Sequence, residues 1–272
     1  MDPSINDEQR LQYVPDADHA FPDDRVNHVL ERIRTDEVIT AYLEAQNVNP
    51  VVRMGYNDHG MKHVNLVRGA ALRLYDLLKA GGVEFNGAHD QGLDESDEAV
   101  IIALAATLHD IGHVVHRHDH SYYSIPLASD VLDRFLGELD WYTPADVIRI
   151  KGETLHAILC HHTSETPLTA EAGVVRIADA LDMKRGRSRI PYERGRRGIN
   201  TLSSQAIRQV SLHSGEDTPV MVEIEMTDAV GVYQVDELLR HKLTDSLLEE
   251  HVRIVAVNIH SKGGGLVERI EL

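Results

Sequence analysis

The sequence predicts a mainly α protein, a helical bundle with a small C-terminal α+β domain. Two observations support this prediction. Between residues 24 and 200, apolar residues recur at spacings of three and four, the period of an amphipathic helix. From about Thr201 onward they alternate with polar residues, as in half-buried strands. We therefore divide the chain into an acidic N-terminal arm (1–23), a helical domain (24–200) and an appended α+β domain (201–272).

The first part of the helical domain predicts two long segments. Residues 24–47 form an amphipathic pattern with a break near Thr35, and Asn49-Pro50 ends it. We expect a short extended piece over 51–56. A second helix is predicted from Met61 to about Ala80, where Gly81-Gly82 provides a stop, followed by a polar linker over 83–94.

The central helix is an unbroken apolar run over 99–108, preceded by acidic and hydroxyl residues that suit a helix N-terminus. Gly112 makes its continuation through 109–120 costly. Three more helices are expected after it. They span 121–139 with Pro126 inside or in the first turn, 143–162 with Thr143 as cap, and 167–183 with Thr169 as cap.

The C-terminal part predicts strands near 207–212, 220–226, 252–258 and 266–270, with a helix over 234–250 between the second and third. Clusters of metal-binding residue types are lacking there. We expect this region to be separable and to serve assembly or regulation.

Composition narrows the class of protein. The single cysteine, Cys160, excludes an internal disulfide. A formal charge of -17 argues against general nucleic-acid binding, and the excess of Arg over Lys on an acidic surface favours a halophilic, high-salt cytoplasm. Apolar runs are far shorter than the roughly 20 residues that cross a bilayer. The polar N-terminus lacks the features of a secretory signal, so we expect a cytoplasmic protein with no membrane association.

The chemistry is concentrated in residues 105–120, AATLHDIGHVVHRHDH, which follow the apolar run. His109 and Asp110 emerge side by side at the end of a core helix. Imidazole with carboxylate suits Mn, Fe, Co, Ni or Zn, and a carboxylate can bridge two ions. Further along, Asp179 interrupts the apolar face of its helix. A lone buried carboxylate is costly, so Asp179 must be paired or bound to metal.

Four blocks in order, YNDHGMKHVNLV, ATLHDIGHVVHRHDH, ILCHHTSE and VVRIADALDMKRGRSRIPY, resemble the HD-domain metal-dependent phosphohydrolase superfamily over residues 50–190. The resemblance implies a helical HD domain that holds one or two divalent ions (Mn, Fe, Co, Ni, Zn or Mg). It implies the metal ligands His63, His109, Asp110 and Asp179. His59 ranks lower, because Gly60 favours a turn there, and Asp182 ranks below Asp179.

The same resemblance implies catalytic roles for Asp110, His113 and His116, with His113 or His116 donating a proton to the leaving oxygen. His120, His161 and His162 are candidates for a second metal or for contact with the substrate phosphate. The implied substrate is a phosphorylated small molecule, with a nucleotide favoured.

The basic run over 184–197 begins five residues after Asp179 in an otherwise acidic chain. We expect Lys184, Arg185, Arg187 or Arg189 to contact substrate phosphate, since arginine binds phosphate bidentately. The alternative is a basic face at a contact between subunits of a homo-oligomer. Two other functions share the scaffold, namely a di-iron oxygenase and a nucleotide-binding sensor without turnover.

Overall fold

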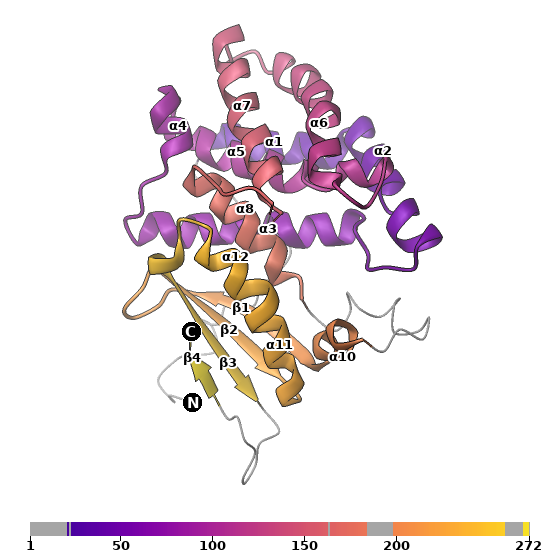
Figure 1. Cartoon of the computed structure of the whole chain (residues 1–272). Coiled ribbons are helices and arrows are strands. Elements are labelled where there is room, and N and C mark those ends of the chain that lie inside the picture. Colours follow the sequence, from indigo (N-terminus) through magenta and orange to yellow (C-terminus); the bar gives the residue numbers. More distant parts are fainter. Residues whose placement is uncertain (1–20, 22, 163, 184–197, 259–268, 272) are drawn as a thin grey trace.

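Helices dominate the chain, and one mixed sheet lies on one side of helix α3 (Figure 1). This computed structural model describes residues 21, 23–162, 164–183, 198–258 and 269–271. The predicted fold class, a mainly α bundle with a small C-terminal α+β part, is confirmed.

The N-terminal helices are α1 (Asp24–Thr35) and α2 (Glu37–Ala45). They separate at Asp36, whose carboxylate caps α2 by accepting hydrogen bonds from the amides of Val38 and Ile39. The break expected near Thr35 is therefore present.

The extended piece expected over 51–56 is wrong. Val48–Arg53 is instead a π-helical turn, in which the carbonyls of Asn49 and Val51 accept from the amides of Met54 and Gly55. Pro50 fits there because it lies near the start of the turn, where its missing N–H is not needed.

Helix α3 (Met61–Ala80) has the predicted bounds. The linker expected over 83–94 contains a short helix, α4 (Asn86–Gln91). Buried Glu171 explains it, since its carboxylate accepts hydrogen bonds from the amides of Gly87 and Ala88 in the first turn of α4.

Helix α5 (Glu95–Leu108) is the centre of the bundle, and its side chains from Asp97 onward are buried. It packs against α1 and α3 and against two later helices, α7 (Pro144–Cys160) and α8 (Ala170–Leu181). A 3-10 turn (Ile111–Val114) and then α6 (His120–Gly137) follow it, so the helix ends at the His-Asp pair as predicted.

The C-terminal region begins with α10 (Ile199–Ala206) and forms a four-stranded sheet in the order β1-β2-β3-β4. The strands are β1 (Ile207–His213), β2 (Val220–Met226), β3 (Val252–Asn258) and β4 (Arg269–Glu271). Strands β2 and β3 run parallel, while the other two pairs are antiparallel.

The connection between β2 and β3 is helical but shorter than the predicted 234–250. It comprises α11 (Val232–Gln234), a π-helical turn (Val235–Arg240) and α12 (His241–Thr244). Helical structure stops before Leu247, which adopts the left-handed conformation at φ 67°. A 3-10 turn (Glu249–His251) then leads into β3.

The sheet and its helices pack on the bundle, with α12 against α8 and β1 and β2 against α3 (Figure 1). Apolar residues of the strands and of the bundle belong to one buried cluster. Separability of residues 201–272 stays a prediction. Among the described residues, every helix is too short or too polar to cross a membrane.

We predict that Glu171→Gln changes the pH dependence of stability. Burial, the largest influence, raises the pKa of Glu171 from 4.5 to about 7, while the hydrogen bonds from Gly87 and Ala88 partly oppose it. The folded state therefore binds this proton more tightly than the unfolded state. The protonated carboxyl of Glu171 therefore contributes up to ~3 kcal/mol to the free energy of unfolding. This contribution is complete below about pH 4.5 and is lost as the pH rises through about 7.

Urea denaturation at pH 5 and pH 8 measures the effect. Between pH 5 and pH 8, Glu171→Gln should lose less free energy of unfolding than the wild type. Glu216→Gln, at an exposed position, should lose the same amount as the wild type. Identical pH dependence in Glu171→Gln and wild type would contradict the assignment.

Candidate metal centre

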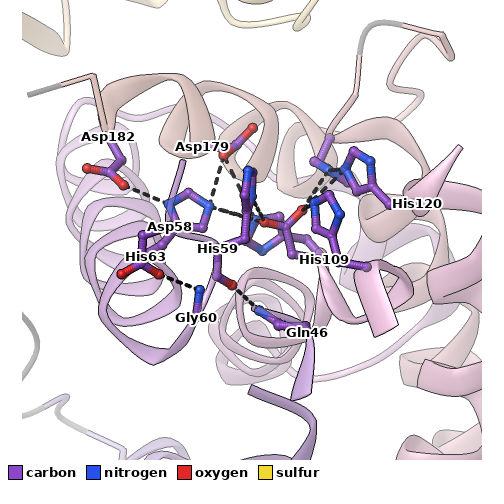
Figure 2. A network of polar contacts seen from close by, with 12 residues as sticks. Gln46, Asp58, His59, Gly60, His63, His109, His120, Asp179 and Asp182 are labelled. Atoms are coloured by element: carbon purple, nitrogen blue, oxygen red, sulfur yellow. Dashed lines mark hydrogen bonds and ion pairs between the residues drawn. The ribbon is translucent and has the colours of Figure 1, made fainter. Parts of the chain in front are cut away.

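The buried carboxylate of Asp110 lies at the centre of a group of six imidazoles, four of which, from His59, His63, His109 and His120, are labelled in Figure 2. Asp110 follows the last turn of α5, and the 3-10 turn after it keeps the carboxylate inside the bundle. The six histidines come from α3 and the loop before it, the end of α5, the 3-10 turn, the start of α6 and the end of α7. They are His59, His63, His109, His113, His120 and His161.

One oxygen of Asp110 faces α3. Its Oδ2 lies 2.7 Å from Nδ1 of His59 and 3.3 Å from Nε2 of both His63 and His109. Oδ1 of Asp179, from α8, lies 3.3 Å from Nε2 of His63 and 3.9 Å from Nε2 of His109. His63, His109 and Asp179 converge closely enough to share one ion.

The other oxygen of Asp110 faces α6 and α7. Its Oδ1 lies 3.2 Å from Nε2 of His120, 3.5 Å from Nε2 of His113 and 3.7 Å from Nε2 of His161. His113 and His120 stack at 4.2 Å between ring centroids, and Nε2 of His120 lies 3.1 Å from Nε2 of His161. Each carboxylate oxygen of Asp110 therefore faces its own group of imidazole nitrogens.

Backbone carbonyls orient three of these rings. Nδ1 of His109, His120 and His161 each lies within hydrogen-bond distance of the carbonyl three residues earlier, at Ala106, Arg117 and Ile158. Because carbonyls accept only, Nδ1 carries the proton and Nε2 offers its lone pair to the site.

The carboxylate of Asp182 orients His63 in the same way, at 2.7 Å from Nδ1 (Figure 2). Asp182 caps the C-terminus of α8. A carboxylate behind a histidine fixes the tautomer and raises the basicity of the ligating nitrogen.

The protonation states suit a cation. Burial alone would raise the pKa of Asp110, but the surrounding imidazoles, His109 first and then His59 and His113, hold it well below its usual value. Burial lowers the pKa of His161 well below the ordinary value and also lowers the pKa of His113. Burial alone would lower the pKa of His120 too, but its hydrogen bond to Asp110 raises it. An ionised carboxylate beside neutral imidazoles is the form that binds divalent metals, and the pKa directions of Asp110, His113 and His161 favour it.

A direct test of fit comes from His113. Its ring is fully buried, and neither nitrogen has a hydrogen-bond partner among the described residues. Leaving two such atoms unpaired is costly, and a cation between Nε2 and Asp110 would remove part of that cost. The residues present therefore fit a metal on each side of the carboxylate.

A pocket of about 430 Å³ opens onto this group. Asp110, His120, His161 and Asp179 line it from the bundle, and Lys242 lines it from α12. Nζ of Lys242 lies 2.5 Å from Oδ2 of Asp179. A molecule in the pocket would thus touch both the metal-binding groups and the C-terminal region.

The sequence-predicted residues fall into four sets. The structure brings together His63, His109, Asp110 and Asp179, and adds His113, His120 and His161 on the second side. His162 lines the pocket without contacting Asp110 in the described part of the chain. His116 is exposed and accepts a hydrogen bond from the amide of His118, outside the group. Lys184, Arg185, Arg187 and Arg189 lie outside the described residues.

Three residues were underestimated from sequence. His59 was ranked low because Gly60 suggested a turn, yet the turn itself delivers the ring, since Gln46 donates a hydrogen bond to the His59 carbonyl and Asn47 accepts from its amide. Asp182 ranks below Asp179 in the sequence, yet its carboxylate orients the ring of His63. Lys242 carries no local signal, because only tertiary packing brings α12 to α8.

Residues 69–184 match the family model of the HD domain. Together with the ordered series of histidines and aspartates, this match shows that the chain belongs to the HD-domain metal-dependent phosphohydrolase superfamily. His63 lies just outside the matched segment.

The chain is also similar to an uncharacterized protein of Methanocaldococcus jannaschii, MJ1020. The two are 32% identical over 228 residues, which cover 84% of this chain and 87% of the relative. The similarity therefore extends well beyond the HD segment on both of its sides.

We predict that Gly112→Ala disrupts the site. A Cβ at Gly112 would lie 1.9 Å from the carbonyl oxygen of His120 and 2.6 Å from the amide nitrogen of Ser124, both backbone atoms of α6. The first turn of α6 must then move, taking His120 away from Asp110. We expect a loss of about 1–3 kcal/mol of stability or more, and fewer bound metal ions per chain.

Thermal denaturation and elemental analysis test this. Gly152→Ala is the matched control, because nothing lies within 4 Å of its added carbon, and it should be neutral or stabilise α7 by about 0.5–1 kcal/mol. Unchanged melting temperature and metal content in Gly112→Ala would contradict the proposed constraint.

Proposed function

We propose that this protein hydrolyses a phosphate ester or anhydride, with a nucleotide as the favoured substrate and two divalent cations at the centre. The single observation that carries the proposal is the two-sided environment of Asp110. One carboxylate oxygen faces His63 and His109, and the other faces His113, His120 and His161. Paired metal sites that share a carboxylate are typical of phosphoryl transfer to water.

When bound, divalent cations polarise a phosphoryl oxygen and lower the pKa of a water molecule toward neutrality. The chain supplies the remaining requirements. His63, His109 and Asp179 would hold one ion, His113, His120 and His161 the other, and Asp110 would bridge them. Burial of these side chains keeps bulk water from competing with their lone pairs.

We assign proton donation to a histidine that lines the open pocket and not to one that is buried beside Asp110. His113 is fully buried with Nε2 directed at Asp110, which favours a ligand. His162 lines the pocket where a leaving group could reach it, while His116 lines a neighbouring pocket. Cys160 is unsuited as a nucleophile, because burial raises the pKa of its thiol to about 11.

Turnover is favoured over the sensor function. All four metal ligands that the family resemblance implies are present and converge, namely His63, His109, Asp110 and Asp179. The extra histidines also suit a di-iron oxygenase, so dioxygen uptake by iron-loaded protein is the discriminating measurement. A screen of phosphate esters and anhydrides with Mn, Co, Ni, Fe and Mg tests hydrolysis itself.

We predict the number of ions that individual variants retain. Protein equilibrated with Mn²⁺ should hold two ions per chain, His63→Ala and His113→Ala should each hold one, and Asp110→Ala should hold none. All three variants should lose hydrolysis, because neither side alone completes the centre. The ions are counted by elemental analysis after dialysis.

His89→Ala is the control for this experiment, since His89 is exposed and pairs with Asp90. It should retain both ions and full activity. Metal content and hydrolysis at the wild-type level in Asp110→Ala would refute the assignment of the centre.

We also predict that Arg185→Ala, Arg187→Ala and Arg189→Ala raise KM or lower kcat/KM for a nucleotide while leaving bound metal unchanged. Arginine forks bind phosphate oxygens, and this segment leaves α8 directly after Asp182 and Met183. Steady-state kinetics and elemental analysis are the measurements. Wild-type kinetics in all three variants, or a change confined to the oligomeric state, would assign the segment to a subunit contact instead.

A further inference from the structure

The C-terminal region places one lysine inside the metal-binding pocket. Nζ of Lys242 lies 2.5 Å from Oδ2 of Asp179, and its side chain is only 11% exposed. Lys242 belongs to α12, which packs on α8, so the contact joins the appended region to the centre of the HD domain. A buried ammonium needs a counter-anion, and Asp179 provides it.

Two of the groups that contact Asp179 have different charge requirements. Its Oδ1 faces Nε2 of His63, where we place a cation, while its Oδ2 meets Lys242. Once a divalent cation neutralises Asp179, the ammonium of Lys242 loses most of this attraction. Its charge then remains in the pocket beside the metals, available to an anion.

The pocket offers few other cations for this purpose. Among its described lining residues, Arg117 and Lys242 are the cationic side chains. Arg117 is engaged elsewhere, with its guanidinium over the ring of Tyr56 at 4.4 Å and Nη1 at 3.2 Å from Nε2 of His59. Lys242 has a flexible stem and three donors on a compact charge, which suits a phosphoryl group of variable position.

A second group on the same wall points to a ligand independently. Ser204, in α10, lines the pocket, and only 6% of the residue's surface is exposed to solvent. Its hydroxyl has no hydrogen-bond partner among the described residues. A buried hydroxyl left unpaired costs free energy, and a polar group of a bound molecule would satisfy it.

We propose that Lys242 and Ser204 form a substrate-recognition subsite, contributed by the C-terminal region, in which Lys242 binds a phosphoryl oxygen and Ser204 hydrogen-bonds the group attached to the phosphate. This inference rests on the proposed hydrolase function. It specifies the substrate as a phosphate compound whose remaining part carries a hydrogen-bonding group, and it assigns Lys242 to direct binding of the substrate.

The test uses inorganic phosphate as the probe and full-length, Mn²⁺-loaded protein. In Lys242→Met, calorimetry should show phosphate binding weakened about ten- to hundredfold, because a charged hydrogen bond is lost, with metal content no lower than in wild type. Lys242→Arg should recover part of the affinity. Lys151→Met is the matched control, since it removes the same charge and an ion pair, with Asp133 at 2.7 Å, outside the pocket.

Unchanged phosphate affinity in metal-loaded Lys242→Met would overturn the inference and leave Lys242 as a neutralising partner of Asp179 only. Loss of metal from this variant would overturn it as well, because Lys242 would then support the centre and not the substrate. Absence of hydrolysis in the wild type would refute the proposed function, whereas the phosphate titration still reports on Lys242.

Ser204→Ala separates the two parts of the subsite. It should leave inorganic phosphate affinity unchanged and raise KM several-fold for phosphate esters that the wild type hydrolyses, with kcat less affected. Ser211→Ala, a similarly buried serine in β1, should leave KM unchanged. Equal KM values in Ser204→Ala and wild type for every hydrolysed ester would remove Ser204 from the subsite.

Discussion

The electrostatic balance around Asp110 is the constraint on which the site depends. A buried carboxylate is strongly disfavoured in its ionised form, yet six imidazoles lie within 3.7 Å of its oxygens, and those of His109, His59 and His113 hold its pKa low. Burial in turn lowers the pKa of His161 and His113, whereas the hydrogen bond to Asp110 raises the pKa of His120. Removing either the carboxylate or several rings would leave uncompensated buried polar groups. Cations on both sides of the carboxylate would satisfy the whole assembly at once.

The ligands gather around Asp110 because each lies at or near a terminus of its helix. His63 lies in the first turn of α3, His109 follows α5, His120 begins α6, and His161 follows α7. Asp179 and Asp182 lie in the last turn of α8 and just beyond it. Helix C-termini have unpaired carbonyls, and His109 and His161 use the carbonyls of Ala106 in α5 and Ile158 in α7 to fix the tautomer. The carbonyl of Arg117, in the loop before α6, does the same for His120. Rigid helices with their ends gathered around one carboxylate thus set the positions of the ligands.

Much of the bundle could be predicted from the sequence, because its helices are long and periodic and carry strong caps such as the capping box of Thr143 and Asp146. The π-helical turn at Val48–Arg53 and the short helix α4 depend on local hydrogen bonds and on distant Glu171, which leave no periodic signal. At the site, the order of four residues along the chain could be recognised in the sequence: His63, His109, Asp110 and Asp179. The positions of His59 and Lys242 could not be predicted, because a turn places His59 and a tertiary contact places Lys242.

The position of Lys242 along the chain has a consequence for how the protein matures. During synthesis, all the proposed metal ligands leave the ribosome before Lys242 does. A bundle that has folded before α12 packs on α8 would therefore offer Asp179 to a cation without competition from Lys242. In such a chain, metal insertion and the completion of the substrate pocket would be successive steps in the biogenesis of one polypeptide.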